Sequence, residues 1–439
     1  MGSYLPSTKQ EQKQMLEAIG LKDLKDLFTG DVPNSVLLEN SVNIPEGLSE
    51  MSVRTKMENI AAKNTVFSTI LRGAGAYDHY IPAIVPAVTS RDEFLTAYTP
   101  YQAEISQGVL QSIFEYQTMV CELTGMDVSN ASIYDGASAA AEGVMMTLTR
   151  KRDRVCVSAT AHPDVISTIK TYCWGRDIPF ELLPEKDGKL DLTALDSLKE
   201  DTACVYLQQP NYYGQFEDAE LAREKIHKAG AKAVLGVYPT TLGLVKSPGE
   251  MGYDIAVAEG QPLGMPLSWG GPYLGILAAK KELMRSMPGR IVGETVDAKG
   301  RRAYVLTLQA REQHIRREKA SSNICSNQAL CAMTASIYLA VMGPKGMEEV
   351  AQLCYDGAHY FASELCKLPG FELRYKGDFF NEFVTSCPIE PEKLEKELAK
   401  HGVLSGLPLE NGVLWCATEK LDKNAIDEVV GIIREVCTK

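Results

Sequence analysis

The chain has 439 residues, of which 45% are hydrophobic and 23% charged, a composition typical of globular proteins. Its 45 Lys and Arg residues against 57 Asp and Glu residues give a formal net charge of −12. Such an acidic chain lacks the positive charge that non-specific binding to nucleic acid or to an anionic membrane requires. At this length we expect about two domains and terminal extensions.

No segment predicts a membrane span or a targeting signal. The longest stretch that leans apolar, Cys331 to Gly343, is shorter than the roughly 20 residues of a bilayer-spanning helix. The polar run Lys9 to Gln14 lies where a signal peptide would have its apolar core. The 11 cysteines fall mostly in apolar segments, so we expect reduced thiols and a cytoplasmic location. Neither Cys-x-x-Cys nor His-Glu-x-x-His occurs, and we expect no metal site.

Residues 1–60 are expected to form an N-terminal arm rather than a domain. Thr8 and Glu11 have the spacing of a capping box before a short amphipathic helix, and a second helix is predicted from about Ser49 to Lys63. Such an arm buries little of its own apolar surface. We therefore expect it to pack on a partner subunit or on the main body.

Residues 61–343 are expected to form a large α/β domain. Periodicity predicts helices at Val109–Thr124 and Ala137–Thr149, and a long helix at Asn323–Met342 closes the domain. Short apolar runs predict strands at Arg154–Ser158, Phe180–Leu183, Ala203–Leu207, Ala233–Val237, Ile255–Ala258 and Tyr273–Ala279. Helices such as Pro163–Tyr172 and Ala219–Ala229 separate many of these strands, which favours a mostly parallel sheet.

Residues 344–439 are expected to form a small α+β domain. A helix from about Gly346 to Leu368 opens it. The later elements are predicted as strands near Phe371–Tyr375, Glu382–Thr385 and Val413–Ala417 and as helices at Glu392–His401 and Lys423–Cys437.

Two segments of the large domain have features of a ligand site. Gly136, Ala137 and Ser138 begin a helix, where small residues leave backbone N–H groups open to a phosphate, although a plain helix start has the same composition. His162 follows the strand Arg154–Ser158 at the edge where ligands bind to parallel sheets. There it would lie over a flat cofactor ring, or it would be a capping or core histidine.

Three further segments are rich in polar and aromatic side chains. The loop Tyr98–Gly108 reads as a binding loop or as a rigid turn before the next helix, and Gly73–Pro82 is similar in character. The run Arg311–Lys319 carries four basic side chains. It would bind a phosphate or carboxylate, or it would form a solvated face or an intersubunit ion-pair network.

Taken in order, these segments resemble one family. The runs Gly73–Pro82, Tyr98–Gly108, Ser129–Glu142 and Arg311–Asn327 are similar to the alpha subunits of two-subunit P-proteins, the glycine dehydrogenases (decarboxylating) of the glycine cleavage system. The resemblance covers essentially the whole chain. It implies the aspartate-aminotransferase-like fold of pyridoxal-phosphate (PLP) enzymes, fold type I. It also implies decarboxylation of glycine and transfer of the aminomethyl group to the lipoyl group of the H-protein, with release of carbon dioxide.

The resemblance implies that this chain does not bind PLP covalently. The companion subunit of this family carries its cofactor lysine in a His-Lys-Thr run after a Gly-Phe-Asp strand. The matching strand here is Gly252–Ala258, and the matching position is Pro262, which has no amine. The carboxylate that partners the pyridine nitrogen is also missing from the strand Ala233–Tyr238. We expect the lysine-bearing partner subunit to hold PLP, and this chain to keep a vestigial pocket formed by Gly136, Ala137, Ser138 and His162.

In this fold class the active site lies between subunits, so we expect the chain to complete the site of its partner, with two chains of each kind. The candidates for lent side chains are His79, Tyr98, Thr99, Tyr101, Gln102 and Glu104, followed by Arg311, His314 and Ser322. Two alternatives stay open. The chain would be a stand-alone PLP enzyme that uses a displaced lysine, Lys246 or Lys280, or it would be a purely structural or regulatory subunit.

Overall fold

The computed structural model describes residues 7–29, 31–38, 42–308, 312–325, 327–410 and 412–438, without the side chains of Asn34 and His314. The chain divides into two compact units, Met1–Thr65 and Val66–Lys439. The first unit contains the helices α1 (Lys9–Ala18) and α2 (Glu50–Ala61), and neither of them buries a residue. The predicted capping box is confirmed, because Thr8 and Glu11 each accept a hydrogen bond from the other's backbone N–H.

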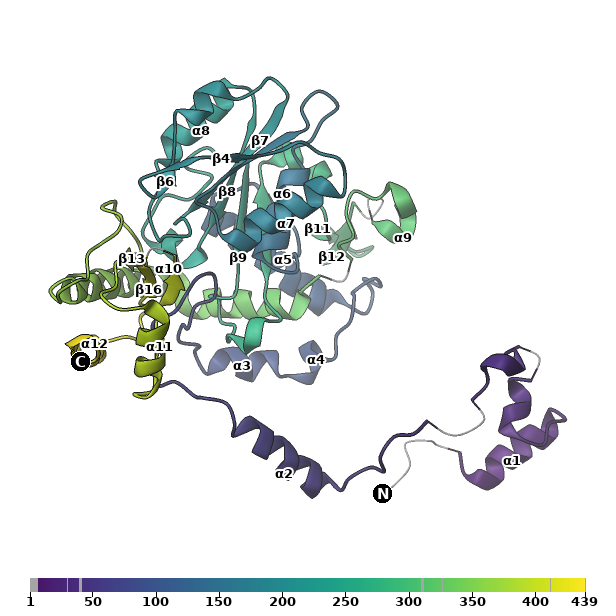
Figure 1. Cartoon of the computed structure of the whole chain (residues 1–439). Coiled ribbons are helices and arrows are strands. Elements are labelled where there is room, and N and C mark those ends of the chain that lie inside the picture. Colours follow the sequence, from purple (N-terminus) through teal and green to yellow (C-terminus); the bar gives the residue numbers. More distant parts are fainter. Residues whose placement is uncertain are drawn as a thin grey trace. The chain divides into compact units, whose positions relative to one another are not determined.

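A seven-stranded sheet forms the centre of the second unit (Figure 1). Its strands lie in the order β2 (Val128–Ser129), β10 (Gly275–Ala279), β9 (Ile255–Glu259), β8 (Lys232–Val237), β7 (Thr202–Gln209), β3 (Arg154–Ser158) and β4 (Phe180–Leu183). The strands β9, β8, β7, β3 and β4 run parallel, and β10 is antiparallel to both of its neighbours. The predicted mostly parallel sheet is therefore confirmed.

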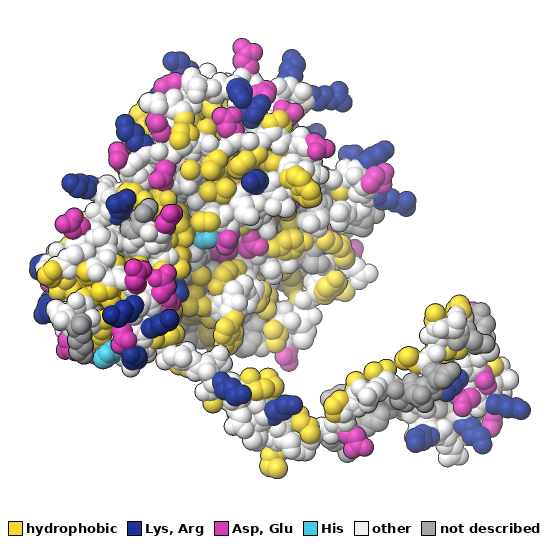
Figure 2. All heavy atoms as spheres, in the orientation of Figure 1, with side chains coloured by type: hydrophobic (Ala, Val, Ile, Leu, Met, Phe, Trp, Pro, Cys, Tyr) yellow, Lys and Arg dark blue, Asp and Glu magenta, His cyan; other side chains and the backbone are white. Residues whose placement is uncertain are grey.

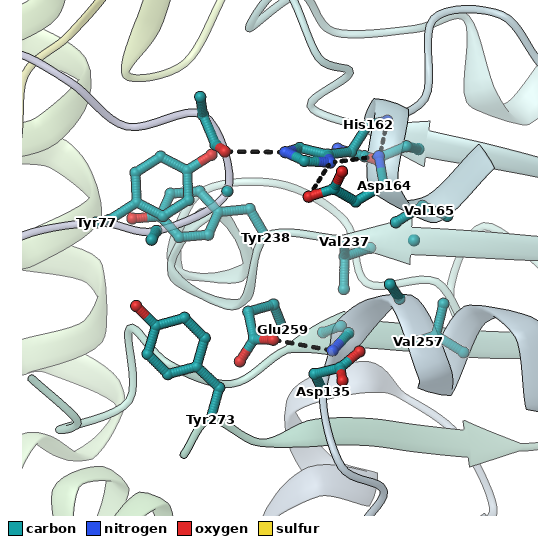
Figure 3. Close-up of a pocket in the computed structure, with 18 of the residues that line it drawn as sticks. Tyr77, Asp135, His162, Asp164, Val165, Val237, Tyr238, Val257, Glu259 and Tyr273 are labelled. Carbon is teal, nitrogen blue, oxygen red and sulfur yellow. Dashed lines mark hydrogen bonds and ion pairs between the residues drawn. The ribbon is translucent and has the colours of Figure 1, made fainter. Parts of the chain in front are cut away.

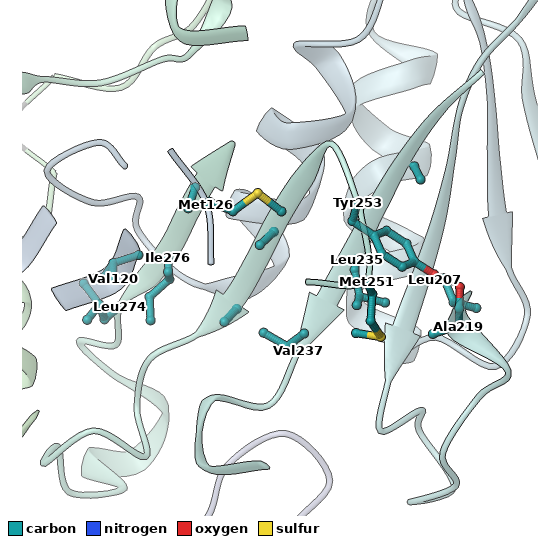
Figure 4. Packing of buried hydrophobic residues seen from close by; sticks show 14 of the residues in the cluster. Val120, Met126, Leu207, Ala219, Leu235, Val237, Met251, Tyr253, Leu274 and Ile276 are labelled. Atoms are coloured by element: carbon teal, nitrogen blue, oxygen red, sulfur yellow. Dashed lines mark hydrogen bonds between the residues drawn. The ribbon is translucent and has the colours of Figure 1, made fainter. Parts of the chain in front are cut away.

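Side chains from alternate positions of the central strands fill two separate buried clusters. Leu207 of β7 and Leu235 of β8 belong to the cluster shown in Figure 4, together with Tyr253. Their sequence neighbours Tyr206 and Val234 belong to the other cluster. Because both faces of the sheet are covered, its strands are apolar throughout instead of alternating with polar residues.

Helices connect and cover these strands. They are α5 (Gln107–Thr124), α6 (Gly136–Met145), α7 (Pro163–Trp174) and α8 (Ala219–Lys228). The unit also contains the shorter helices α3 (Ile84–Thr89), α4 (Asp92–Leu95) and α9 (Gln313–Arg316). Gly125 ends α5 in the left-handed conformation, with φ of 67°. The prediction that α6 continues to Thr149 is wrong. The backbone N–H of Thr149 donates to the carbonyl of Arg152, which turns the chain towards β3.

The C-terminal part of this unit contains a second, smaller sheet. The strands of this sheet are β13 (Glu382–Thr385), β15 (Leu407–Leu409) and β16 (Gly412–Cys416). The helices of this part are α10 (Ala329–Leu365), α11 (Pro391–Ala399) and α12 (Lys423–Thr438). Trp415, Phe361 and Phe383 pack together in its core. The backbone of α10 is non-helical at Gly343, which has φ of 59° and precedes Pro344.

Two predictions for this part of the chain are wrong. The expected strand Phe371–Tyr375 is reduced to a single bridge between Leu373 and Thr385. The helix α10 begins at Ala329 instead of Asn323, because the backbone N–H groups of Ile324 and Gln328 donate to the side chains of Ser322 and Ser132.

Further strand pairs were not predicted. They are the hairpin of β11 (Ile291–Val296) and β12 (Arg302–Thr307), the hairpin of β5 (Glu185–Lys186) and β6 (Lys189–Leu190), and the parallel pair of β1 (Thr69–Ile70) and β14 (Val403–Leu404).

Basic and acidic side chains are interspersed over the face shown in Figure 2, as the mixed composition suggests. Within the described part of the chain, no helix combines the length and the apolar character that a bilayer-spanning helix needs. All 11 cysteines are free of disulfides.

Asp254 joins several elements at the edge of the sheet where β9 begins. Its carboxylate accepts hydrogen bonds from the backbone N–H of Ala233 and from the side chains of His227 and Lys232, at 2.7–3.0 Å. Burial raises the pKa of Asp254, but these hydrogen bonds outweigh burial and hold the pKa below its ordinary value. Since the charged form is favoured by folding, its contribution to stability is present at neutral pH and is lost as acid protonates it.

We expect Asp254→Asn to lower the free energy of unfolding at neutral pH by about 2–3 kcal/mol, because it removes one partner of a buried charge network. Urea unfolding followed by circular dichroism measures this. The exposed Asp356→Asn serves as the control and should change little. The difference between wild type and Asp254→Asn should shrink on acidification, and a constant difference would contradict the assignment.

Candidate functional site

A cavity of about 520 Å³ opens at the edge of the sheet where the parallel strands end (Figure 3). Its walls come from Gln208 at the end of β7, from Val237 and Tyr238 at the end of β8, and from Glu259 at the end of β9. The first residues of α6 and α7 complete it. This is the edge at which open α/β sheets bind their ligands.

His162 is a cap of α7 and also lines the cavity. Its Nδ1 accepts from the N–H of Asp164 at 3.1 Å, so its Nε2 carries the proton and donates to the carbonyl of Ala74 at 2.9 Å. The ring is therefore fixed at both nitrogens. Gly75 has φ of 101°, and a Cβ atom there would lie 2.9 Å from His162 Nε2, so this approach requires glycine.

Glu259 fills the place between β9 and the beginning of α6. Its Oε2 accepts from the N–H of Gly136 at 2.9 Å, and its Oε1 accepts from the N–H groups of Gln261 and Leu274 at 2.9 and 3.2 Å. Burial raises the pKa of Glu259 to about 7, although these hydrogen bonds oppose the shift. The anion at this helix N-terminus is thus a side chain of the protein itself.

The predicted pocket residues take different positions. Gly136 and Ala137 line the cavity together with His162. Ser138 is not among the lining residues. It donates its N–H and its hydroxyl to the carboxylate of Asp135, which caps α6. Gly136 and Ala137 therefore fit the interpretation as a ligand site, and Ser138 fits the interpretation as an ordinary helix start.

The described residues of the cavity do not fit covalently held PLP. None of the lining residues is a lysine, and Pro262 is buried. The resemblance places the carboxylate that partners the pyridine nitrogen at the end of β8, and the residues that line the cavity there are Val237 and Tyr238. The carboxylates that do line the cavity, Asp135, Asp164 and Glu259, come from other elements.

The two displaced lysines lie away from this cavity. Lys246 pairs with Glu220 at 2.8 Å on the surface. Lys280 donates to the carbonyl of Gly252 at 3.0 Å and lies 3.6 Å from Asp254. Asp254 precedes β9, whereas Glu259 at the other end of this five-residue strand lines the cavity, a separation of about 15 Å.

His79 lies inside the protein. It is 6% exposed, its Nδ1 is 2.6 Å from Glu419, and its Nε2 contacts the hydroxyl of Tyr238. Burial raises the pKa of Glu419, but the hydrogen bond and the charge of His79 outweigh burial and lower it. Cys354 donates to the same carboxylate at 3.4 Å. His79 therefore supports the cavity wall at Tyr238 instead of reaching the surface.

The loop around Tyr101 is exposed and is fixed by a buried arginine. Tyr98 is 80% exposed and Tyr101 49%, and Gln102 and Glu104 are also exposed, while Thr99 is half-buried. The Tyr101 hydroxyl accepts from Arg290 at 3.0 Å and lies 3.8 Å from the Cys325 sulfur. Arg290 is 2% exposed and also approaches Cys325 at 3.7 Å. The structure thus brings the predicted loop to the segment that follows Arg311–Lys319.

The second group of candidates is only partly described. Arg311 and the side chain of His314 lie outside the described residues. Ser322 donates to Glu142 of α6 at 2.8 Å, so its hydroxyl is bound within the chain. Arg290 was missed because a single arginine after Pro288 and Gly289 carries no local signal of its role.

Glu382 holds the segment Gly73–Pro82 against β13. It accepts from the N–H of Ala74 at 2.6 Å and from the hydroxyl of Tyr77 at 2.7 Å, and Tyr77 stacks beside Tyr238 with ring centroids 4.3 Å apart. Burial raises the pKa of Glu382 to about 7, against the effect of these two hydrogen bonds. The folded protein therefore favours the protonated form more than the unfolded chain does.

We expect the free energy of unfolding to fall as pH rises between about 4.5 and 7, by up to about 1.4 kcal/mol per pH unit for each proton involved. Glu382→Gln keeps the shape of the neutral acid and should make the free energy of unfolding less dependent on pH. Glu259 should account for part of the pH dependence that remains in this variant. Urea midpoints across this range measure the slope. The exposed Glu372→Gln is the control, and an unchanged slope in Glu382→Gln would disprove the assignment.

Comparisons with known proteins agree over the whole chain. The family model described as glycine cleavage system P-protein matches residues 2–433. A probable glycine dehydrogenase (decarboxylating) subunit 1 of Carboxydothermus hydrogenoformans is 48% identical over 441 residues, covering 98% of this chain and 99% of that protein. The resemblance stated from the sequence is confirmed.

Solved structures give the same result. A crystal structure of glycine decarboxylase (P-protein) of the glycine cleavage system, in inhibitor-bound form, superposes with a TM-score of 0.94 at 41% identity and covers 99% of this chain and 100% of that chain. A glutamate decarboxylase from Lactobacillus brevis shares the fold alone, with a TM-score of 0.68 at 13% identity over 92% of this chain and 96% of its own. The expected PLP-dependent transferase fold, fold type I, is confirmed, and the chain belongs to the glycine cleavage system P-protein family.

Proposed function

We propose that this chain is the alpha subunit of a two-subunit glycine dehydrogenase (decarboxylating) and that its lysine-bearing partner holds PLP. One observation carries this proposal. The cavity at the usual cofactor position has no lysine among its described lining residues, and its helix N-terminus binds Glu259. The eleven unpaired cysteines suit a cytoplasmic enzyme, where thiols stay reduced.

The proposed reaction is shared between subunits. Glycine loses carbon dioxide, and its aminomethyl carbon passes to the lipoyl disulfide of the H-protein, which is reduced in the same step. PLP in the partner supplies the electron sink for decarboxylation. This chain contributes binding groups at the interface, in an assembly with two chains of each kind.

The loop Tyr98–Gly108 is the proposed contribution to the partner's site. Tyr98 and Tyr101 are exposed, and the buried Arg290 donates a hydrogen bond to the Tyr101 hydroxyl at 3.0 Å. The Tyr101 hydroxyl and the Gln102 amide can donate hydrogen bonds to the glycine carboxylate or to the cofactor phosphate, and Glu104 can accept a proton. A loop that is held by Arg290 and exposes Gln102 and Glu104 is suited to contact a second subunit.

The N-terminal arm is proposed to pack on the partner subunit or on the main body. Its helices α1 and α2 bury no residue, and large apolar side chains such as Ile19, Phe28 and Met57 are about half exposed. Exposed apolar surface of this extent is unfavourable in water and is typical of a segment that packs on another protein surface.

We expect the double substitution Tyr101→Phe and Gln102→Ala to lower turnover of the assembled complex by on the order of tenfold to a hundredfold, because it removes both donors from the shared site. Glycine-dependent exchange of carbon dioxide in the reconstituted complex measures this. Tyr360→Phe with Gln352→Ala makes the same chemical changes on α10 and serves as the matched control. Unchanged turnover and cofactor affinity would leave only the structural or regulatory reading.

We also expect the cofactor to be found on the partner alone. Borohydride reduction of the complex, followed by peptide mass spectrometry, should place PLP on a lysine of the partner and leave every lysine of this chain unmodified. The isolated chain, treated in the same way, is the control. PLP found on Lys246 or Lys280 would instead support the alternative that this chain is a stand-alone PLP enzyme with a displaced lysine.

A further inference from the structure

The beginning of α6 is occupied by two carboxylates of the chain itself. Glu259 accepts the N–H of Gly136 at 2.9 Å, and Asp135 accepts the N–H of Ser138 at 2.8 Å. Backbone N–H groups at a helix N-terminus are a ready site for a phosphate group, since they combine free donors with the positive end of the helix dipole. Here these two donors already have anionic partners.

Glu259 is bound as a phosphate would be bound. Its two oxygens accept from N–H groups of three separate segments, namely Gly136 at the start of α6, Gln261 after β9, and Leu274 before β10. These distances lie between 2.9 and 3.2 Å. Hydrogen bonds to a charged acceptor are stronger than neutral ones, so an incoming anion would have to displace a well-held group.

Glu259 packs closely against Gly136 at the start of α6. A Cβ atom added to Gly136 would lie 2.8 Å from the Glu259 Cβ and 2.9 Å from its backbone nitrogen. The end of β9 therefore presses directly on the first turn of α6. Burial also raises the pKa of Glu259, and the nearby charge of Asp135 adds to this shift, as expected where anions crowd together.

We propose that Glu259 is a specificity residue that keeps phosphate-bearing cofactors out of this chain's own cavity, so that PLP enters only the partner's site. The proposal rests on the proposed division of labour between the two subunits. It assigns the exclusion to one side chain, in addition to the missing lysine. A lysine is needed for the covalent bond, whereas the Glu259 carboxylate prevents non-covalent binding of the phosphate group.

The rest of the cavity stays suited to a flat ring. The His162 ring is fixed at both nitrogens, and Tyr77, Tyr238 and Tyr273 also line the space. The exclusion therefore acts on the phosphate group rather than on the ring. This distinction can be measured, because pyridoxal and pyridoxal phosphate differ only in that group.

Glu259→Ala tests the proposal in the full-length chain. It keeps the Cβ that contacts Gly136 and removes only the carboxylate. Isothermal titration with inorganic phosphate and with pyridoxal phosphate should show binding tighter than in wild type by on the order of tenfold or more, as one charge-assisted hydrogen bond can supply. Binding of pyridoxal without the phosphate should change much less.

Two further variants control this result. Glu217 is a buried glutamate that also accepts a backbone N–H, from Leu190 at 3.0 Å, and Glu217→Ala should gain no affinity for phosphate. Glu259→Ser is a second replacement with a small polar side chain. Thermal unfolding of each Glu259 variant is also measured with and without phosphate. A rise in the unfolding temperature on addition of phosphate, absent in wild type, supports the proposal.

Several outcomes would overturn it. One is that wild type binds phosphate at the start of α6 as tightly as Glu259→Ala does, and another is that both Glu259 variants fold but gain no affinity. The proposed function is tested separately by turnover of the complex with wild-type Glu259. Gain of phosphate binding by Glu259→Ala, together with an inactive wild-type complex, would keep this inference and reject the shared active site.

Discussion

The hydrogen bond from the Gly136 N–H at the start of α6 to the Glu259 carboxylate places an acidic side chain in the wall of the cavity at the end of the sheet. Parallel strands and the helices between them create this edge, and a helix N-terminus there favours an anion. In this chain the group at that position is the side-chain carboxylate of Glu259. Tyr238 lines the cavity at the end of β8, and no described lining residue is a lysine. Under the proposed division of labour, these two features and the Glu259 carboxylate would all act against cofactor chemistry in this subunit.

The cavity is nevertheless rigidly built. Buried carboxylates are costly unless they are hydrogen-bonded, and here Glu382 binds Ala74 and Tyr77 while Glu419 binds His79. These contacts fasten the segment 73–82 to the C-terminal part of the protein. The segment then continues through α3 and α4 to the exposed loop 98–108. The polar network that forms this wall of the cavity therefore also fixes the start of the chain segment that leads to the loop.

The fold could be predicted where its signals are local. Apolar runs located the strands of the large sheet except β2, which has only two residues, and the spacing of Thr8 and Glu11 located a helix start that the structure contains. The start of α10 was predicted too early, because Ser132, almost 200 residues away, binds the backbone of Gln328. The same limit applies to the site. His162 could be placed by the strand before it, but Glu259 acquires its role from Gly136, 123 residues away, and no sequence pattern joins the two.

Arg290 joins the buried interior to the exposed loop 98–108. A guanidinium that is 2% exposed has lost most of its hydration, and its Nε has no hydrogen-bond partner among the described residues. Its contacts to Tyr101 and Cys325 join a surface loop to a segment that is distant in the sequence. The buried carboxylate of Glu312 lies 3.9 Å from the Arg290 guanidinium and balances its charge within the chain, whereas Tyr101, the outer partner, is also open to water. In the proposed complex, a second subunit that covers the loop would exclude water from Tyr101, and its hydrogen bond with Arg290 would be stronger in that less polar environment. Part of the free energy of association would then go into ordering the side chains of the loop.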